Sequence, residues 1–144
     1  MPRRFGFTLV ELLIVVVVIA LMGTFATETY VRAYEKNRGY NAVAMVRLLR
    51  AAEGIYFMDW NTHTDLVYPC ASNLVSGGYM QCPNQGDPID RGFSYSVTVT
   101  APDTFTAQAT RNGTGRYAGK TINLAHSTGT ATWFGDWPNE WLPR

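Results

Sequence analysis

The chain has 144 residues, enough for one globular domain, and 47% of them are hydrophobic whereas only 16% are charged. The formal net charge of +1 is close to neutral. This balance argues against a nucleic-acid-binding surface, because such surfaces concentrate lysine and arginine.

The first element is a short basic leader followed by a long apolar run. Arg3 and Arg4 lie in the leader, which Gly6 closes, and the stretch from Phe7 to Ala26 is apolar almost throughout, with Glu11 as its one charge. About twenty residues, each rising about 1.5 Å, span roughly the hydrocarbon core of a bilayer. The run is therefore predicted to cross a membrane, with the arginines on the cytoplasmic side and the rest of the chain outside.

Hydropathy alone leaves other interpretations of this segment open. An ordinary secretory signal has the same basic start and apolar centre, and Thr24 and Ala26 are small enough for cleavage after Ala26. A single-span membrane anchor fits equally well. A charged residue at the centre of a membrane-spanning helix costs about 3 kcal/mol, and this cost is lower near the end of the run, where Glu11 lies. The plainer interpretation of Glu11 is therefore a carboxylate that the membrane tolerates. An ordinary signal, however, gains nothing from a carboxylate there.

The six residues Gly6-Phe7-Thr8-Leu9-Val10-Glu11 closely resemble the cleavage site of type IV pilins and pseudopilins, the class III signal family. The resemblance implies cleavage after Gly6 by a prepilin peptidase, methylation of the new amine of Phe7, and pairing of Glu11 with the amine of a neighbouring subunit. It is specific over about the first thirty residues and architectural over the remainder.

The helical pattern continues well beyond the apolar run. No proline occurs between Pro2 and Pro69, and Glu28 and Arg32 have the i,i+4 spacing that supports an exposed helix surface. Apolar residues then recur at helical spacing along one face: Met45, Leu48, Leu49, Ala52, Ile55 and Tyr56. One long helix is predicted, with Met45, Leu49, Ala52 and Tyr56 as its contacts to the sheet.

The segment from Asp59 to Arg91 is predicted to be a loop, because it holds three prolines and the pair Gly77-Gly78. A short helical turn is expected at Ser72 to Leu74. Cys70 and Cys82 bracket this loop and are the only cysteines. In an exported chain they are predicted to form one disulfide, with two free thiols as the alternative.

Beyond Phe93 the apolar period changes from helical to alternating. Alternation from Phe93 to Val99 and from Phe105 to Ala109 predicts two strands joined by a turn. Thr121–Leu124 and Thr130–Phe134 predict two more. In the tail, tryptophans are expected to cover the open edge of the sheet, or else to form a subunit or ligand contact: Trp133, Trp137 and Trp141.

Few residues are arranged for catalysis. His63 and His126 are far apart in the sequence, lie in predicted loops and are interpreted as surface histidines. No catalytic triad, metal-spaced cluster or phosphate loop is present, so no catalytic residue and no cofactor are expected. Calcium is a minor possibility, by similarity to the major pseudopilins. Its oxygen ligands would come from one of two loop sets: Asp87 and Asp90, or Asp136, Asn139 and Glu140.

These patterns predict an α+β fold in which a long N-terminal helix, half membrane-embedded and half amphipathic, packs on an antiparallel sheet of three or four strands. The expected organisation is a leader at residues 1–6, a helix at residues 7–58 with its membrane-spanning or filament-core part at 7–26, and a head at residues 59–144.

The resemblance implies a structural, non-enzymatic subunit of a type IV pilus-like filament. Its expected partners are other copies of the chain, the prepilin peptidase, the membrane and the inner-membrane assembly machinery. The precursor is expected in the inner membrane, and the assembled subunit at the cell surface or in the periplasm. A pseudopilin of a type II secretion system is the alternative within the family, and a membrane-anchored or secreted monomeric binding module is the alternative from another class.

Overall fold

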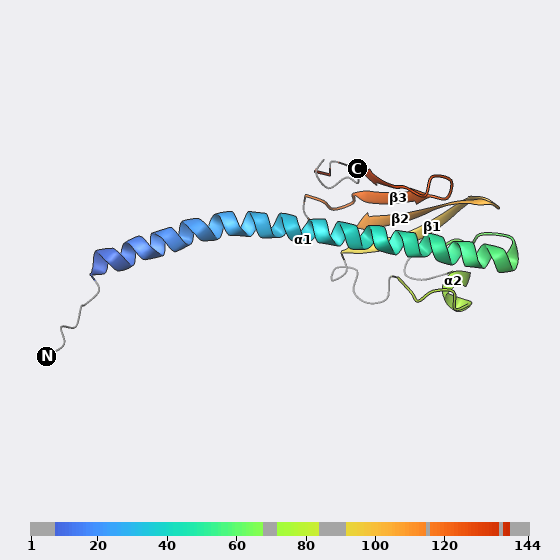
Figure 1. Cartoon of the computed structure of the whole chain (residues 1–144), viewed down its shortest axis with the longest axis horizontal. Helices are drawn as coiled ribbons and strands as arrows, with labels where there is room; N and C mark the ends of the chain where they lie inside the picture. The colour runs from blue at the N-terminus through green and yellow to red at the C-terminus, as the bar shows by residue number, and fades with distance from the viewer. Residues whose placement is uncertain (1–7, 68–71, 84–91, 115, 136, 139–144) are drawn as a thin grey trace. The chain divides into compact units, whose positions relative to one another are not determined.

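The computed structural model describes residues 8–67, 72–83, 92–114, 116–135 and 137–138, in two units, Met1–Asn37 and Arg38–Arg144. A long helix, α1, is followed by a short helix and a four-stranded sheet (Figure 1). The bounds are α1 (Leu9–Trp60), α2 (Asn73–Ser76), β1 (Phe93–Ala101), β2 (Thr104–Arg111), β3 (Thr121–Ala125) and β4 (Ala131–Phe134). The predicted α+β fold class is confirmed, and the sheet has four strands.

Polar side chains and backbone geometry account for both ends of α1. At the start, the Thr8 hydroxyl oxygen accepts a hydrogen bond from the Glu11 backbone N–H at 3.2 Å. The Thr8-x-x-Glu11 spacing is that of a capping box, which satisfies an otherwise unpaired donor of the first turn. At the other end, Asn61 takes a left-handed conformation with φ of 52°, a conformation that asparagine tolerates better than most residues at a helix end.

The sheet is an antiparallel meander in which each strand pairs with its sequence neighbours, in the order β1-β2-β3-β4. One row of directly paired residues crosses all four strands and is buried throughout: Val97, Ala107, Leu124 and Ala131. Because side chains alternate between the two faces of a strand, the intervening threonines and polar residues point to the other face. This alternation is the one that the sequence predicts.

The C-terminal part of α1 packs on this apolar face. Its core residues are Ala42, Val43, Val46 and Leu49. The predicted contact at Leu49 is therefore confirmed, and Met45 is partly buried against the same core. Ala52 and Tyr56, however, pack in a second cluster with Leu74 of α2.

The predicted apolar face of α1 was wrong in part, because the inward stripe contains a charged residue. Positions 42, 46, 49 and 53 have the spacing of one helical face, and the last is the fully buried Glu53. Leu48 and Ile55, assigned to that face from hydropathy, are 60% and 53% exposed. Because hydropathy treats a carboxylate as a surface group, the predicted apolar face was displaced around the helix toward Leu48 and Ile55.

The tail tryptophans were predicted to cover the sheet edge, and this prediction was wrong for Trp137. Trp137 lies in the main core, where its ring stacks on Phe93 and Tyr117 and meets Trp133 edge-on at a centroid distance of 5.0 Å. Trp133 in turn lies against Gly39 of α1, where an added Cβ would be 2.8 Å from the Trp133 Cη2 atom. Trp141 lies outside the described residues.

Candidate functional site

The N-terminal part of α1 has a continuous apolar surface whose side chains are exposed in the part of the chain that the structure describes. A stretch within α1 is long and apolar enough to cross a membrane, with a mean hydropathy of 2.7, and none of it is buried. Its large apolar side chains, from Leu9 to Met22, are all exposed. Water is a poor environment for such a surface, because each Å² of exposed apolar area costs roughly 25 cal/mol. The segment therefore requires a lipid or protein environment.

Glu11 is the charged residue within this apolar surface. It lies in the first turn of α1, where a carboxylate is favoured by the helix dipole. Its backbone N–H is bound to Thr8, and no described residue hydrogen-bonds to its carboxylate. Gly6 and Phe7, the predicted cleavage and methylation positions, lie outside the described residues. The carboxylate is thus available to a group from outside the described part of the chain.

Two threonines in this part of α1 satisfy their hydroxyls within the helix. Thr24 donates to the Leu21 carbonyl at 2.7 Å, and Thr27 donates to the Gly23 carbonyl at 2.8 Å. Such bonds allow hydroxyl groups to lie in apolar surroundings without a further partner. An added Cβ on Gly23 would meet nothing within 4 Å, so no contact of the described chain requires a glycine there.

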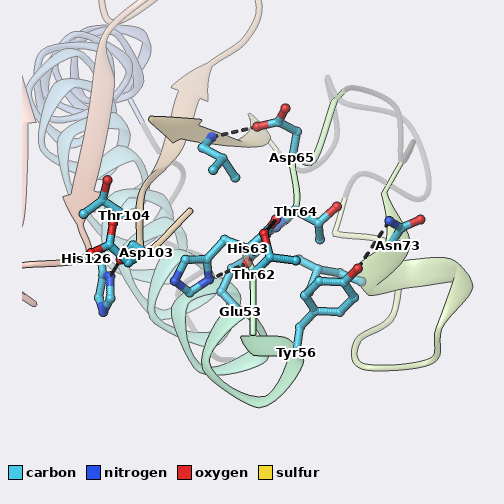
Figure 2. Close-up of polar contacts among 12 residues, drawn as sticks. Glu53, Tyr56, Thr62, His63, Thr64, Asp65, Asn73, Asp103, Thr104 and His126 are labelled. Atoms are coloured by element: carbon cyan, nitrogen blue, oxygen red, sulfur yellow. Dashed lines mark hydrogen bonds and ion pairs between the residues drawn. The ribbon is translucent and has the colours of Figure 1, made fainter. Parts of the chain in front are cut away.

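The second arrangement of polar residues lies in the head and was not predicted. Glu53 of α1 accepts a hydrogen bond from His63 at 3.0 Å, between Oε2 and Nδ1, and another from the Thr64 backbone N–H at 3.2 Å (Figure 2). The His63 ring lies 5.2 Å from that of His126, between centroids. The surface interpretation of His63 was therefore wrong: residues far apart in the sequence meet, and His63 is buried.

The surroundings of this pair are apolar on most sides. The His63 ring stacks on Phe57 and contacts Phe105, with centroid distances of 4.8 and 4.6 Å. His126 Nδ1 lies 2.8 Å from the Asp103 carbonyl oxygen, to which it donates. Among the described residues neither Glu53 Oε1 nor His63 Nε2 has a hydrogen-bond partner.

Burial is the largest cause of the pKa shifts of both groups. Burial raises the pKa of Glu53 to about 7, against a smaller lowering by the Thr64 N–H and with a further increase from Asp65. Burial, together with the nearby His126, lowers the pKa of His63, while Glu53 and Asp103 oppose this shift. Each group thus disfavours its charged form. The hydrogen-bonded pair can therefore hold a shared proton.

The remaining predicted site residues can be placed only in part. Cys70 and the calcium candidates lie outside the described residues: Asp87, Asp90, Asp136, Asn139 and Glu140. Cys82 lies in the described part but Cys70 does not, so the disulfide between them stays a prediction. Within the described ranges, no group of three or more histidines, cysteines or acidic residues is placed to hold a metal ion.

Comparison with known proteins bears on the N-terminal segment. The family model described as the prokaryotic N-terminal methylation motif matches residues 1–27. The comparisons with curated proteins and with solved structures each gave no match. The match covers the leader, the Gly6-Phe7 junction, Glu11 and the apolar run, which are the features on which the resemblance to type IV pilins and pseudopilins rests. Residues 1–27 of this chain therefore carry the prokaryotic N-terminal methylation motif.

Proposed function

We propose that the chain is a structural subunit of a type IV pilus-like filament, cleaved after Gly6 and polymerised through the N-terminal part of α1. The observation that carries the proposal is the coincidence of the methylation motif at residues 1–27 with a fully exposed apolar stretch in the same segment. The motif accounts for processing, and the exposed stretch provides the surface through which subunits associate.

The exposed surface supports both states that a filament subunit passes through. Before assembly, a bilayer covers the side chains from Leu9 to Met22, and the leader arginines hold the orientation. After assembly, equivalent segments of other subunits cover the same side chains. Because lipid tails are as apolar as leucine, transfer between the two environments costs little, and close helix packing provides the cohesion.

Glu11 fixes the position of one subunit along its neighbour, which the apolar surface alone does not specify. Cleavage after Gly6 creates an amine on Phe7, four residues before Glu11. Within one subunit the two groups can pair across one helical turn. Between subunits the amine of an incoming chain reaches Glu11 of an assembled one. In a filament core, such a pair is strong only when both charges are present, because an unpaired buried carboxylate costs several kcal/mol.

The test is the variant Glu11→Gln, which keeps the size of the side chain and removes its charge. We expect Glu11→Gln to be cleaved normally, to accumulate in the inner membrane and to form few filaments, as counted by electron microscopy of sheared cells. The matched control is Glu28→Gln, which removes an exposed carboxylate, paired with Arg32 at 2.6 Å, from the same helix. A normal filament yield from Glu11→Gln would contradict the proposed register role.

The same experiment distinguishes the alternatives. Long surface filaments at native expression favour a pilus, whereas filaments seen only on overexpression favour a pseudopilus of a type II secretion system. If the protein is never cleaved at Gly6 and never polymerises, the proposal fails, and the alternative of a membrane-anchored or secreted monomeric binding module is favoured.

A further inference from the structure

An open hollow of about 450 Å³ lies between the C-terminal end of α1 and helix α2. Its lining residues are Tyr56, Trp60, Asn73, Ser76, Gly77 and Tyr79. This volume is within the range of small-ligand sites. The lining shares no residue with the N-terminal segment or with the Glu53–His63 pair, so neither the filament function nor the buried proton accounts for it.

Three of the residues that line the hollow are aromatic. Tyr56 is buried and meets Tyr79 edge-on, with a centroid distance of 5.2 Å. Trp60 stacks on Tyr56 at 6.2 Å with an interplanar angle of 26°. In contrast to Tyr56, Trp60 is 63% exposed. The hollow therefore has an exposed indole ring on a buried aromatic support.

Hydrogen bonds fix the orientation of these rings. The Trp60 indole N–H donates to the Tyr79 hydroxyl at 2.9 Å, and that hydroxyl donates to the Asp59 carboxylate at 2.9 Å. The Tyr79 ring also lies against Gly77, where an added Cβ would be 2.6 Å from Tyr79 Cε2. An exposed tryptophan with its N–H already bonded loses little freedom when a ligand binds, which favours affinity.

The polar groups of the hollow are neutral amides and hydroxyls. The Asn73 side-chain amide donates to the Tyr56 hydroxyl at 3.4 Å (Figure 2), which leaves the Asn73 carbonyl oxygen as an acceptor. Ser76 donates to the Ser72 carbonyl at 3.3 Å, which leaves the lone pairs of its oxygen for another donor. None of the lining residues is charged, and the nearby Asp59 disfavours an anion.

This combination matches the chemistry of a sugar ring. A pyranose presents a face of C–H groups, which packs on an exposed aromatic ring, and a rim of hydroxyls, which bonds to amides and hydroxyls. A quaternary ammonium ion instead needs ring faces on several sides. Here Tyr56 is buried and Tyr79, which meets it edge-on, is half-buried, so Trp60 is the exposed ring of the lining.

We propose that this hollow binds a neutral saccharide, with Trp60 as the stacking platform and with Asn73 and Ser76 as hydrogen-bonding groups. The site is independent of the filament function, because it uses only residues at the C-terminal end of α1, in α2 and just after α2.

The test is binding of neutral trisaccharides to the full chain, purified in a polyoxyethylene ether detergent that contains neither sugar nor ammonium groups. Chitotriose, cellotriose and maltotriose are titrated separately by isothermal calorimetry and by tryptophan fluorescence. We expect saturable binding of at least one of them. We expect Trp60→Ala to weaken that binding about tenfold or more, which corresponds to about 1.4 kcal/mol, and Trp60→Phe to weaken it less.

Matched variants separate binding from folding. Phe134→Ala removes a second exposed aromatic side chain from the head, outside the hollow, and is expected to leave affinity unchanged. Asn73→Ala tests the polar side without removing a ring. The proposal is overturned if none of the three saccharides binds at millimolar concentration, or if Trp60→Ala and Asn73→Ala both bind like the unaltered chain. Binding of tetramethylammonium chloride without any saccharide response overturns the assigned ligand class.

Discussion

The replacement Glu53→Gln gives the most quantitative test of the head structure. The Glu53 side chain is fully buried and hydrogen-bonds to His63 and to the Thr64 N–H. Its pKa is raised from 4.5 to about 7, chiefly because burial disfavours the carboxylate. Glutamine keeps the shape and an acceptor oxygen but cannot ionise, so the variant removes the proton equilibrium and largely preserves the packing.

The direction of the effect follows from where each state holds its proton. The unfolded chain releases the Glu53 proton near pH 4.5, whereas the folded chain retains it to about pH 7. Between these values the folded state binds more protons, so the Glu53 contribution to stability falls as the pH rises and is constant above about pH 7. At about 1.4 kcal/mol per pH unit, the loss is about 3 kcal/mol.

His63 contributes with the opposite sign. Its folded pKa is lowered, so the unfolded state takes up a proton near pH 6.5 that the folded state resists. The His63 contribution is therefore fully present above pH 6.5 and is lost as the pH falls below it. Glu53→Gln retains His63 but removes a contact that opposes the lowering of the His63 pKa. The difference in unfolding free energy between the variant and the unaltered chain therefore contains the Glu53 part and, below about pH 6.5, a His63 part of the same sign.

The assay is urea denaturation of both proteins in detergent between pH 4.5 and pH 8, followed by near-ultraviolet circular dichroism. We expect the stability of Glu53→Gln relative to the unaltered chain to increase by about 3 kcal/mol across this range. Glu28→Gln, which alters an exposed carboxylate, should show no comparable trend. If the curves of Glu53→Gln and the unaltered chain run parallel, Glu53 ionises normally and the argument from burial is refuted.

Three other predictions concern processing, the disulfide and packing. The mature protein should have an intact mass that begins at Phe7 and includes one added methyl group; a form beginning at Thr27 would establish the secretory-signal interpretation. Alkylation without reduction should label neither Cys70 nor Cys82, and labelling of both would contradict the bridge. Gly39→Ala should lower the urea midpoint by the equivalent of about 1–3 kcal/mol, because the new Cβ would lie 2.8 Å from Trp133. Gly54→Ala, where nothing lies within 4 Å, should instead be neutral or stabilising, and equal losses from both would argue against the predicted clash.

The elements of the fold could be predicted because each depends on local pattern. The uninterrupted helical pattern predicts α1, and the alternation from Phe93 to Val99 predicts β1. Both periods can be recognised from consecutive residues alone. Ser72 likewise caps α2, with its side chain accepting from the Leu74 N–H at 3.1 Å. The methylation motif was visible for the same reason, because it lies within a few consecutive residues.

The buried polar pair could not be predicted in this way. Glu53 and His63 are ten residues apart, and hydropathy places both at the surface. Only the packing of α1 on the sheet brings them into the core, beside Phe105 of β2 and His126 from the turn after β3. One signal was present: with Ala42, Val46 and Leu49 as core residues, helical spacing puts position 53 on the same face. Trp137 was misassigned for a similar reason, since its stacking partners are distant in the sequence.

The strand order of the sheet has a consequence for how the head folds. Every strand pairs only with its sequence neighbours, so each hairpin can close without waiting for a distant segment. Topologies with such local contacts fold faster than those with long-range pairings. The contact of Trp137 is different, because it reaches back to Phe93 at the start of β1 and thereby closes a loop that includes the entire sheet. The complete core therefore includes a non-local contact made by a residue that belongs to no strand.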